Sequence, residues 1–239
     1  MPLLSVEKVT RRFGGVVAVE DVSFRVEAGE IAGLIGPNGA GKTTVFNLIT
    51  RLYRPDSGAI VFDGETLLRT PPHRVIGRGI ARTFQNVELF RSMTVLENVL
   101  LGMHARRGAN VGEVLDHAGL ADLAHVPVAG LPFGVQKRVE LARALAAAPR
   151  LLLLDEPAGG LNHEEVEELG GLIRRVRNTY DLTILLVEHH MNLVMGIADQ
   201  VHVLDFGRKI AEGTPAEVQA NPSVVEAYLG SERPQNAPA

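Results

Sequence analysis

The stretch that most constrains this chain is a glycine-rich loop of nine residues between two apolar segments. It follows the apolar run 31–35, leads into the apolar positions of 45–49, and consists of Gly36, Pro37, Asn38, Gly39, Ala40, Gly41, Lys42, Thr43 and Thr44. Its spacing matches G-x-x-x-x-G-K-[ST], in which backbone N–H groups surround a phosphate at the start of a helix. We therefore predict a strand, a nucleotide-binding loop and a helix, with Lys42 at the β- and γ-phosphates and Thr43 on Mg²⁺. A plain glycine-rich turn is the alternative, and the flanking apolar segments argue against it.

Composition limits the remaining possibilities. At 239 residues the chain can form one α/β core with a small additional subdomain. A net charge of -4 gives no electrostatic argument for nucleic-acid binding, and we interpret Arg74, Arg78 and Arg82 as part of a phosphate site or a solvated surface. Without cysteine the chain forms no disulfide and no thiolate metal site. We expect no signal peptide, and no membrane-spanning segment, because no apolar run approaches the ~18 residues required.

Two adjacent acids follow a strand that is apolar throughout. Residues 151–154 are four consecutive leucines, which is typical of a fully buried strand, and Asp155 and Glu156 come next. Such a strand has no structural reason to end on two carboxylates unless a cation or a reacting group lies there. We predict that Asp155 lies on the Mg²⁺ side and that Glu156 is the base that polarises the attacking water. Two acids in a solvated turn are the alternative.

Two other predicted strands also end on polar residues. Gln85 follows 79–84, where its amide can contact Mg²⁺ or the attacking water, because ligands of α/β sheets bind at the carboxyl ends of the strands. His189 comes after the apolar run 183–187 and could hydrogen-bond the γ-phosphate and the base. Each signal is weak alone, since a histidine at such a position is more often a surface residue. We expect no zinc site at His189 and His190, because no further ligand lies at metal spacing.

The pattern changes to helical spacing from about residue 86 to residue 146. Helices are predicted over 94–103 and 112–124, with no strand between them, which indicates a small helical subdomain inserted into the α/β core. A further helix opens near Gly134 and leaves backbone N–H groups uncovered at its start. This second anion-binding helix terminus could serve the nucleotide of another molecule.

Phe13 lies in a predicted turn between strands over 3–9 and 22–26. An exposed phenylalanine there can stack on a purine ring, or it can pack locally. The other predicted elements are a strand over 59–62, a hairpin of 201–204 and 209–211, helices over 215–220 and 222–229, and a disordered tail over 231–239.

In this order, the motifs resemble those of the ATP-binding subunits of ABC transporters along the whole chain. The resemblance implies an α/β fold of the P-loop NTPase class: a RecA-like core with the inserted helical subdomain and an antiparallel β region, as one domain over residues 1–230. It implies ATP and Mg²⁺ as ligands, with ATP held between two head-to-tail subunits. It also implies transmembrane permease subunits and a second ATPase subunit as partners, a solute-binding protein as an indirect partner, no nucleic acid, and a place at the cytoplasmic face of the membrane.

The same resemblance implies a role for each motif residue. These roles are adenine stacking by Phe13, the Walker A pair Lys42 and Thr43, the Q-loop residue Gln85, the Walker B pair Asp155 and Glu156, and the switch histidine His189. Ligation of Mg²⁺ is implied for Thr43, Gln85 and Asp155. Residues 160–162 stand at the D-loop, where Asn162 replaces the aspartate of many relatives.

Two features depart from the family pattern. The signature turn, which is implied to face the partner's nucleotide, departs from L-S-G-G-Q and consists of Leu131, Pro132, Phe133, Gly134, Val135 and Gln136. Pro132 removes the serine hydroxyl that contacts the γ-phosphate in relatives, so closure is expected to depend more on backbone donors from Gly134 onward. The helical subdomain is also short, since only 112–124 is a predicted helix between residues 103 and 131.

Local sequence narrows the resemblance to the branched-chain amino acid import branch. The segments that carry it are 35–47, 82–85, 187–191 and 227–230. Lipopolysaccharide-export and urea-import ATPases are close relatives of that branch and remain alternatives. A soluble ABC machine acting on ribosomes or DNA usually has two cassettes or a long coiled-coil insertion, and this chain has neither. A small-molecule kinase is disfavoured by the paired carboxylates and the second helix terminus.

Overall fold

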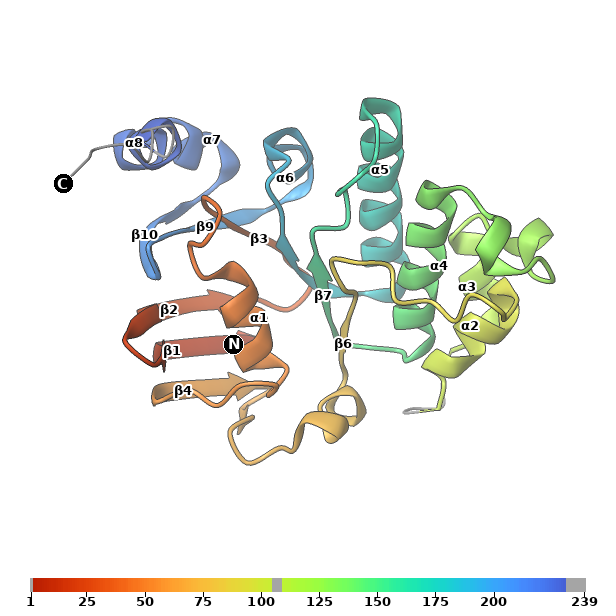
Figure 1. The fold of residues 1–239 in the computed structure, drawn as a ribbon, viewed down its shortest axis with the longest axis horizontal. Coiled ribbons are helices and arrows are strands. Elements are labelled where there is room, and N and C mark those ends of the chain that lie inside the picture. The colour runs from red at the N-terminus through yellow and green to blue at the C-terminus, as the bar shows by residue number, and fades with distance from the viewer. Residues whose placement is uncertain (1, 105–108, 231–239) are drawn as a thin grey trace.

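Two β-sheets organise the chain in a computed structural model that describes residues 2–104 and 109–230 (Figure 1). The predicted tail over 231–239 lies outside the described residues. A six-stranded sheet has the order β10-β9-β3-β8-β7-β6, and a four-stranded sheet has the order β2-β1-β4-β5. The first comprises β3 (Ile31–Ile35), β6 (Ile80–Arg82), β7 (Leu151–Asp155), β8 (Thr183–Val187), β9 (Gln200–Asp205) and β10 (Arg208–Gly213). The second comprises β1 (Leu4–Phe13), β2 (Val16–Val26), β4 (Ser57–Phe62) and β5 (Glu65–Thr66).

The helices cover the sheets and form a separate group at one end, where α2, α3 and α4 lie together (Figure 1). Among the described residues from 86 to 146 there are helices and 3-10 turns but no strand, apart from one isolated bridge between Thr94 and Pro127. The limits of the helical subdomain stay a prediction. The α-helices are α1 (Lys42–Ile49), α2 (Val95–Gly102), α3 (Val111–His117), α4 (Phe133–Ala146), α5 (His163–Tyr180), α6 (Met191–Ile197), α7 (Pro215–Gln219) and α8 (Pro222–Gly230).

The leucine run of β7 is explained by cover on both faces of the larger sheet. Leu151 and Leu153 pack into a core shared with α1 and the antiparallel sheet, whereas Leu152 and Leu154 pack into a core shared with α4, α5 and α6. Strand β8 divides its residues between the same two cores. Because neither face meets water, both strands need continuous rather than alternating apolar residues.

The register of the parallel strands aligns their carboxyl ends. Leu34 of β3 and Asp155 of β7 both pair with Val187 of β8. The residues that follow these strands therefore start side by side at one edge. This edge is where the three strongest sequence motifs meet.

The first two strands are longer than predicted, and the position of Phe13 is a correction. The sequence predicted strands over 3–9 and 22–26 with Phe13 in a turn, but Phe13 is the last residue of β1 and pairs with Val16. Irregularities in the pairing between Val6 and Arg12 interrupt the alternation of inward and outward residues. That interruption hid the full length of both strands from a pattern of period two.

Helix α3 is shorter than the predicted helix over 112–124. Gly119 takes a left-handed conformation with φ of 66° just after the helix. The N–H of Leu120 donates to the carbonyl of Leu115, and that of Gly119 donates to Asp116. This is the Schellman arrangement that ends helices at glycine, and residues 121–123 continue only as a 3-10 turn.

Helix α5 is an addition to the predicted elements. Asn162 caps its first turn by accepting the N–H of Glu165, and the Glu165 carboxylate accepts the N–H of Asn162 in return. The residues Val166, Leu169, Leu172, Ile173 and Val176 form its buried side. The capping pair and this spacing are both visible in the sequence.

Arg82 links three elements, β6, β7 and α1, near the carboxyl ends of the parallel strands. From β6 its guanidinium donates to Asp155 Oδ2 at 2.6 Å and to Asn47 Oδ1 of α1 at 2.7 Å. The side chains of Arg82 and Asp155 are only 9% and 3% exposed. This buried ion pair resolves the two interpretations of Arg82: it belongs to the region of the phosphate loop, not to a solvated surface.

We predict that Arg82→Met lowers the free energy of unfolding by about 3–5 kcal/mol, because it leaves the buried carboxylate of Asp155 without its cation. Urea denaturation measures the change. The matched control is Arg78→Met, since Arg78 forms an exposed ion pair with Glu65 that is worth at most about 1 kcal/mol. Equal losses in the two variants would contradict a structural role for the buried pair.

Candidate functional site

The phosphate loop depends on glycine at positions where backbone segments approach closely. A Cβ on Gly36 would lie 2.1 Å from the carbonyl oxygen of Leu204, and one on Gly41 would lie 2.6 Å from that of Ala18. Both glycines have positive φ, at 150° and 103°. A Cβ on Gly39 would meet no atom within 4 Å, so the middle of the loop faces open space. The loop is thus fixed at its two ends and accessible between them.

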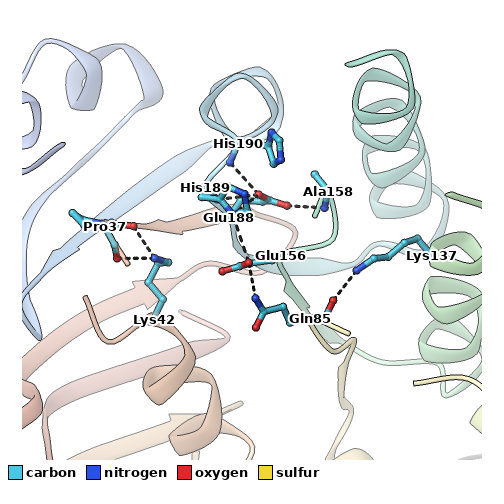
Figure 2. Close-up of polar contacts among 10 residues, drawn as sticks. Pro37, Lys42, Gln85, Lys137, Glu156, Ala158, Glu188, His189 and His190 are labelled. Carbon is cyan, nitrogen blue, oxygen red and sulfur yellow. Dashed lines mark hydrogen bonds and ion pairs between the residues drawn. The ribbon is translucent and has the colours of Figure 1, made fainter. Parts of the chain in front are cut away.

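Lys42 lies inside this loop, at the start of α1 (Figure 2). Its ammonium donates to the carbonyl oxygens of Gly36 at 2.7 Å and Pro37 at 3.0 Å. Burial lowers the pKa of Lys42, while the carboxylates of Glu156 and Asp155 act in the opposite direction. A buried ammonium group that is held by carbonyl oxygens of a glycine-rich loop suits a phosphate group. The charged phosphate oxygens can take the place of the carbonyl oxygens as its hydrogen-bond partners.

The residues predicted to bind Mg²⁺ supply oxygen atoms from separate elements. Thr43 is exposed in the first turn of α1, next to the buried Lys42. Asp155 ends β7, and Gln85 donates through its amide nitrogen, so the amide oxygen is the atom it can offer a metal. A hydroxyl, a carboxylate and an amide oxygen are the hard ligands that Mg²⁺ prefers, so these residues fit the ion.

The structure brings Gln85, Glu156 and His189 together (Figure 2). Glu156 Oε2 accepts the amide N–H of Gln85 at 3.0 Å and lies 3.5 Å from His189 Nδ1. Glu156 has a φ of 47°, a left-handed conformation that costs a non-glycine residue about 1–3 kcal/mol. Its own N–H donates to the carbonyl of Val187 at 2.9 Å, which holds the strained residue against β8. The carboxylate is thereby aimed by the backbone and flanked by two polar side chains.

Phe13 is partly engaged by its neighbours. Its ring is 38% exposed and packs edge-on against Tyr53, with 5.0 Å between the ring centroids. The guanidinium of Arg11 lies 4.7 Å from the same ring. Local packing and an exposed ring face therefore coexist, and adenine stacking stays a prediction.

The signature turn lies away from the phosphate loop of the same chain. Residues 131–136 open α4, which Figure 1 shows on the far side of β6 and β7 from α1. Pro132 is the N-cap of α4 and provides no side-chain hydrogen bond to its first turn. Gly134 allows close contact with α5, since a Cβ there would lie 2.9 Å from Glu165 Oε1. The start of α4 thus has no side-chain cap, and binding of another molecule's nucleotide there stays a prediction.

Helix α4 also holds the loop that follows β6, which the sequence motifs did not indicate. Lys137 Nζ donates to the carbonyl of Gln85 at 2.9 Å, and Glu140 accepts the N–H of Phe84 at 3.2 Å. Burial lowers the pKa of Lys137 and raises that of Glu140. Arg143 donates to the carbonyl of Glu88 at 2.5 Å. The available signal was the spacing of three charged residues three positions apart on one helix face.

Glu188 is a further buried charged residue near the site to which the sequence analysis gave no role. It follows β8, is completely buried, and accepts N–H groups of Ala158, His189 and His190 (Figure 2). Glu188, His189 and His190 each place one possible metal-ligating atom within 4.8 Å of the others. Because the carboxylate already accepts three N–H groups, hydrogen bonding accounts for its burial.

Among the described residues, no helix combines the length and the apolar character that crossing a bilayer requires.

Comparison with known proteins bears on the fold and on the family. Two solved structures cover nearly the whole chain at 29% identity: the ADP conformation of MJ1267, an ATP-binding cassette of an ABC transporter, with a TM-score of 0.89, and cbiO1 from Clostridium perfringens, with a TM-score of 0.85. They cover 96% and 98% of this chain, which covers 99% and 96% of theirs. These similarities confirm the predicted P-loop NTPase fold.

Sequence relatives agree with this result. The high-affinity branched-chain amino acid transport ATP-binding protein BraF of Pseudomonas aeruginosa is 41% identical and LivG of Escherichia coli is 43% identical, each over 96% of this chain and 98% of the relative. The lipopolysaccharide export system ATP-binding protein LptB of Haemophilus influenzae is 34% identical over 97% of this chain and 99% of its own. A family model described as ABC transporter matches residues 19–159, more than half of the chain, and one described as branched-chain amino acid ATP-binding cassette transporter matches residues 208–233. The chain therefore belongs to the ABC transporter family, as its motifs predicted, and it is an ATPase subunit of that family.

Proposed function

We propose that this ATPase powers the import of branched-chain amino acids or similar solutes. The observation that carries the proposal is the match of residues 208–233 to the branched-chain family, at a part of the chain separate from the general ATPase motifs. Relatives named for branched-chain transport are 41–44% identical, whereas the lipopolysaccharide-export relative is 34% identical. In this proposal the chain works at the cytoplasmic face of the membrane with permease subunits and a second ATPase subunit. A solute-binding protein acts indirectly, through the permeases.

A second subunit is needed because one chain does not complete the site. The signature turn 131–136 and the phosphate loop lie on different parts of the molecule (Figure 1). In a head-to-tail dimer, each turn covers the nucleotide of the other chain, and the uncapped start of α4 contributes N–H groups to its γ-phosphate. To shift the dimer from 1:99 to 99:1 in favour of the closed form, ATP must stabilise that form by about 5.5 kcal/mol.

Each site residue has a defined task in hydrolysis. Lys42 exchanges its carbonyl partners for phosphate oxygens, and Thr43, Asp155 and Gln85 are the residues that would hold Mg²⁺. The ion, when bound, offsets negative charge on the transferred phosphoryl group. Glu156 accepts the proton of the attacking water, which requires its carboxylate within hydrogen-bond reach of that water. His189 lies 3.5 Å from this carboxylate and donates a hydrogen bond to the γ-phosphate.

We infer that a permease helix docks on the loop after Gln85. Phe90 is 54% exposed and Glu88 is exposed, so an apolar and an acidic side chain are presented together. The backbone of this loop is bound by Lys137, Glu140 and Arg143 of α4. A displacement of the loop is therefore transmitted to the helix that begins at the signature turn.

We predict that Glu156→Gln lowers the ATP hydrolysis rate by about 10²- to 10⁴-fold, because the amide cannot accept a proton from water. ATP binding and ATP-dependent dimerisation should persist, and phosphate release and size-exclusion chromatography measure the two effects. Glu167→Gln, an exposed carboxylate on α5, is the control and should turn over normally. Near-normal hydrolysis by Glu156→Gln would overturn the assignment of the base.

We predict that Pro132→Ser does not weaken ATP-dependent dimerisation. Serine is a favoured N-cap residue, and its hydroxyl adds a donor at the start of α4, where proline has none. The measurement is the dimer fraction against ATP concentration. The chain with Pro132 and the Pro132→Ser variant are compared, and both carry the slowly hydrolysing Glu156→Gln substitution. A clear loss of dimer would mean that the proline itself is required at this turn.

Copurification of the tagged chain from native membranes tests the transport proposal. We expect polytopic permease subunits and a second, similar ATPase to accompany it. Recovery of ribosomes or nucleic acid without membrane proteins would leave the ATPase in place and overturn transport. The double variant Glu88→Lys with Phe90→Ala should lose the permeases while still binding ATP, because it changes only the exposed docking loop. Unchanged recovery of the permeases by that variant would place the docking surface elsewhere.

A further inference from the structure

Glu188 is a buried acid for which the proposed mechanism has no use. Its side chain is 0% exposed, although an ionised carboxylate in a protein interior is costly unless it is paired or hydrogen-bonded. Oε1 accepts the N–H of Ala158 at 2.7 Å, and Oε2 accepts those of His189 at 2.9 Å and His190 at 3.1 Å. All three partners are donors, and a carboxylate can meet all three because it only accepts.

The charge of Glu188 also acts on the cations around the site. It raises the pKa of Lys42 and of Lys137, in both cases against the effect of burial. The first lysine lies in the phosphate loop and the second holds the backbone of Gln85. Glu188 thus helps to keep both buried lysines charged.

The hydrogen bond from Ala158 joins two segments that carry catalytic residues, while those from His189 and His190 lie within the segment of Glu188 itself. Ala158 lies two positions after Glu156, on the segment that leads to the D-loop residues 160–162. His189 lies directly after Glu188 at the end of β8. On the first segment, the N–H of Glu156 donates to the carbonyl of Val187, the last residue of β8. Residues 156–158 are therefore bonded at one end to Val187 and at the other end to Glu188. Figure 2 shows Glu188 between Ala158 and the two histidines, with Glu156 below.

We propose that Glu188 is a positioning residue for ATP hydrolysis, setting the distance between Glu156 and His189 by binding the backbone of both of their segments. This inference rests on the roles given above to Glu156 and His189. It extends them by assigning the 3.5 Å spacing of those side chains to a third residue, which is fully buried. The same contacts connect the segment that leads to the D-loop with the switch histidine His189.

Glu188→Gln tests the proposal, because glutamine has nearly the same shape but presents an NH₂ group to at least one of the three N–H donors. We expect kcat for ATP hydrolysis to fall about 10- to 100-fold, since small displacements of catalytic groups have effects of this size. The Kd for ATP, measured by competition with a fluorescent nucleotide, should change less than about 3-fold, because Lys42 keeps its contacts and because Glu156 and Asp155, which raise its pKa more than Glu188 does, remain. A merely structural role would lower binding and hydrolysis together.

Asp199→Asn is the matched control. Its carboxylate accepts the N–H of Ile31 at 2.8 Å, so it also holds a strand end by a backbone hydrogen bond, but at the opposite edge of the same sheet. It should lose stability without a selective loss of kcat. If Glu188→Gln does not fold, Glu188→Asp tests the positioning role instead. Aspartate keeps the charge but is too short to reach both segments, so this variant should lower kcat selectively.

The outcomes separate this inference from the proposed mechanism. If Glu156→Gln is inactive and both Glu188 variants retain the kcat of the unmodified chain, the positioning role is wrong while the base assignment stands. An equal loss of kcat and of ATP affinity in a folded Glu188 variant also overturns the positioning role. If Glu156→Gln itself turns over normally, the failure lies with the proposed base.

Discussion

The arrangement of the site depends on one constraint: three parallel strands, buried on both faces, end in register at the same edge of the sheet. Pairing of Val187 with both Leu34 and Asp155 places the phosphate loop, Glu156 and Glu188 side by side. Because side chains alternate between two apolar cores along these strands, a slip of one residue would bring every side chain to the wrong face. The hydrophobic pattern therefore sets the catalytic geometry as well as the fold.

Buried charge is concentrated where these strands end. Asp155 is paired with Arg82, Glu188 is bound by three N–H groups, and Lys42 is held by two carbonyls. Replacing both members of a buried ion pair by apolar side chains often does not reduce stability, although removing one member does, so stability alone does not explain the presence of such pairs. The common property of these buried charged groups is that each is held in place beside the proposed phosphate site. Charged groups that are already positioned can stabilise a transition state without moving during the reaction.

Helix α4 connects the two surfaces that the proposed function assigns to the partner ATPase subunit and to the permease. Its first turn is the signature turn, and its buried side holds the backbone of residues 84–88 through Lys137, Glu140 and Arg143. These charged side chains make directional bonds to the backbone of a loop whose side chains Glu88 and Phe90 are exposed. The loop and the helix are thus joined by hydrogen bonds, whereas the phosphate loop lies at the start of α1.

By itself, the sequence determined the fold class, the phosphate loop and the residues at the strand ends, because these depend on local spacing and on continuous apolar runs. It did not determine the full lengths of β1 and β2 or the path of Phe13, because bulges disrupt the alternation on which strand prediction depends. Only the tertiary structure decided the contacts of Arg82, Glu140 and Glu188, since these partners lie 73, 56 and 30 residues away. Such contacts follow from sheet order and helix packing, and a linear pattern carries no information about which distant backbone group a buried charge will meet.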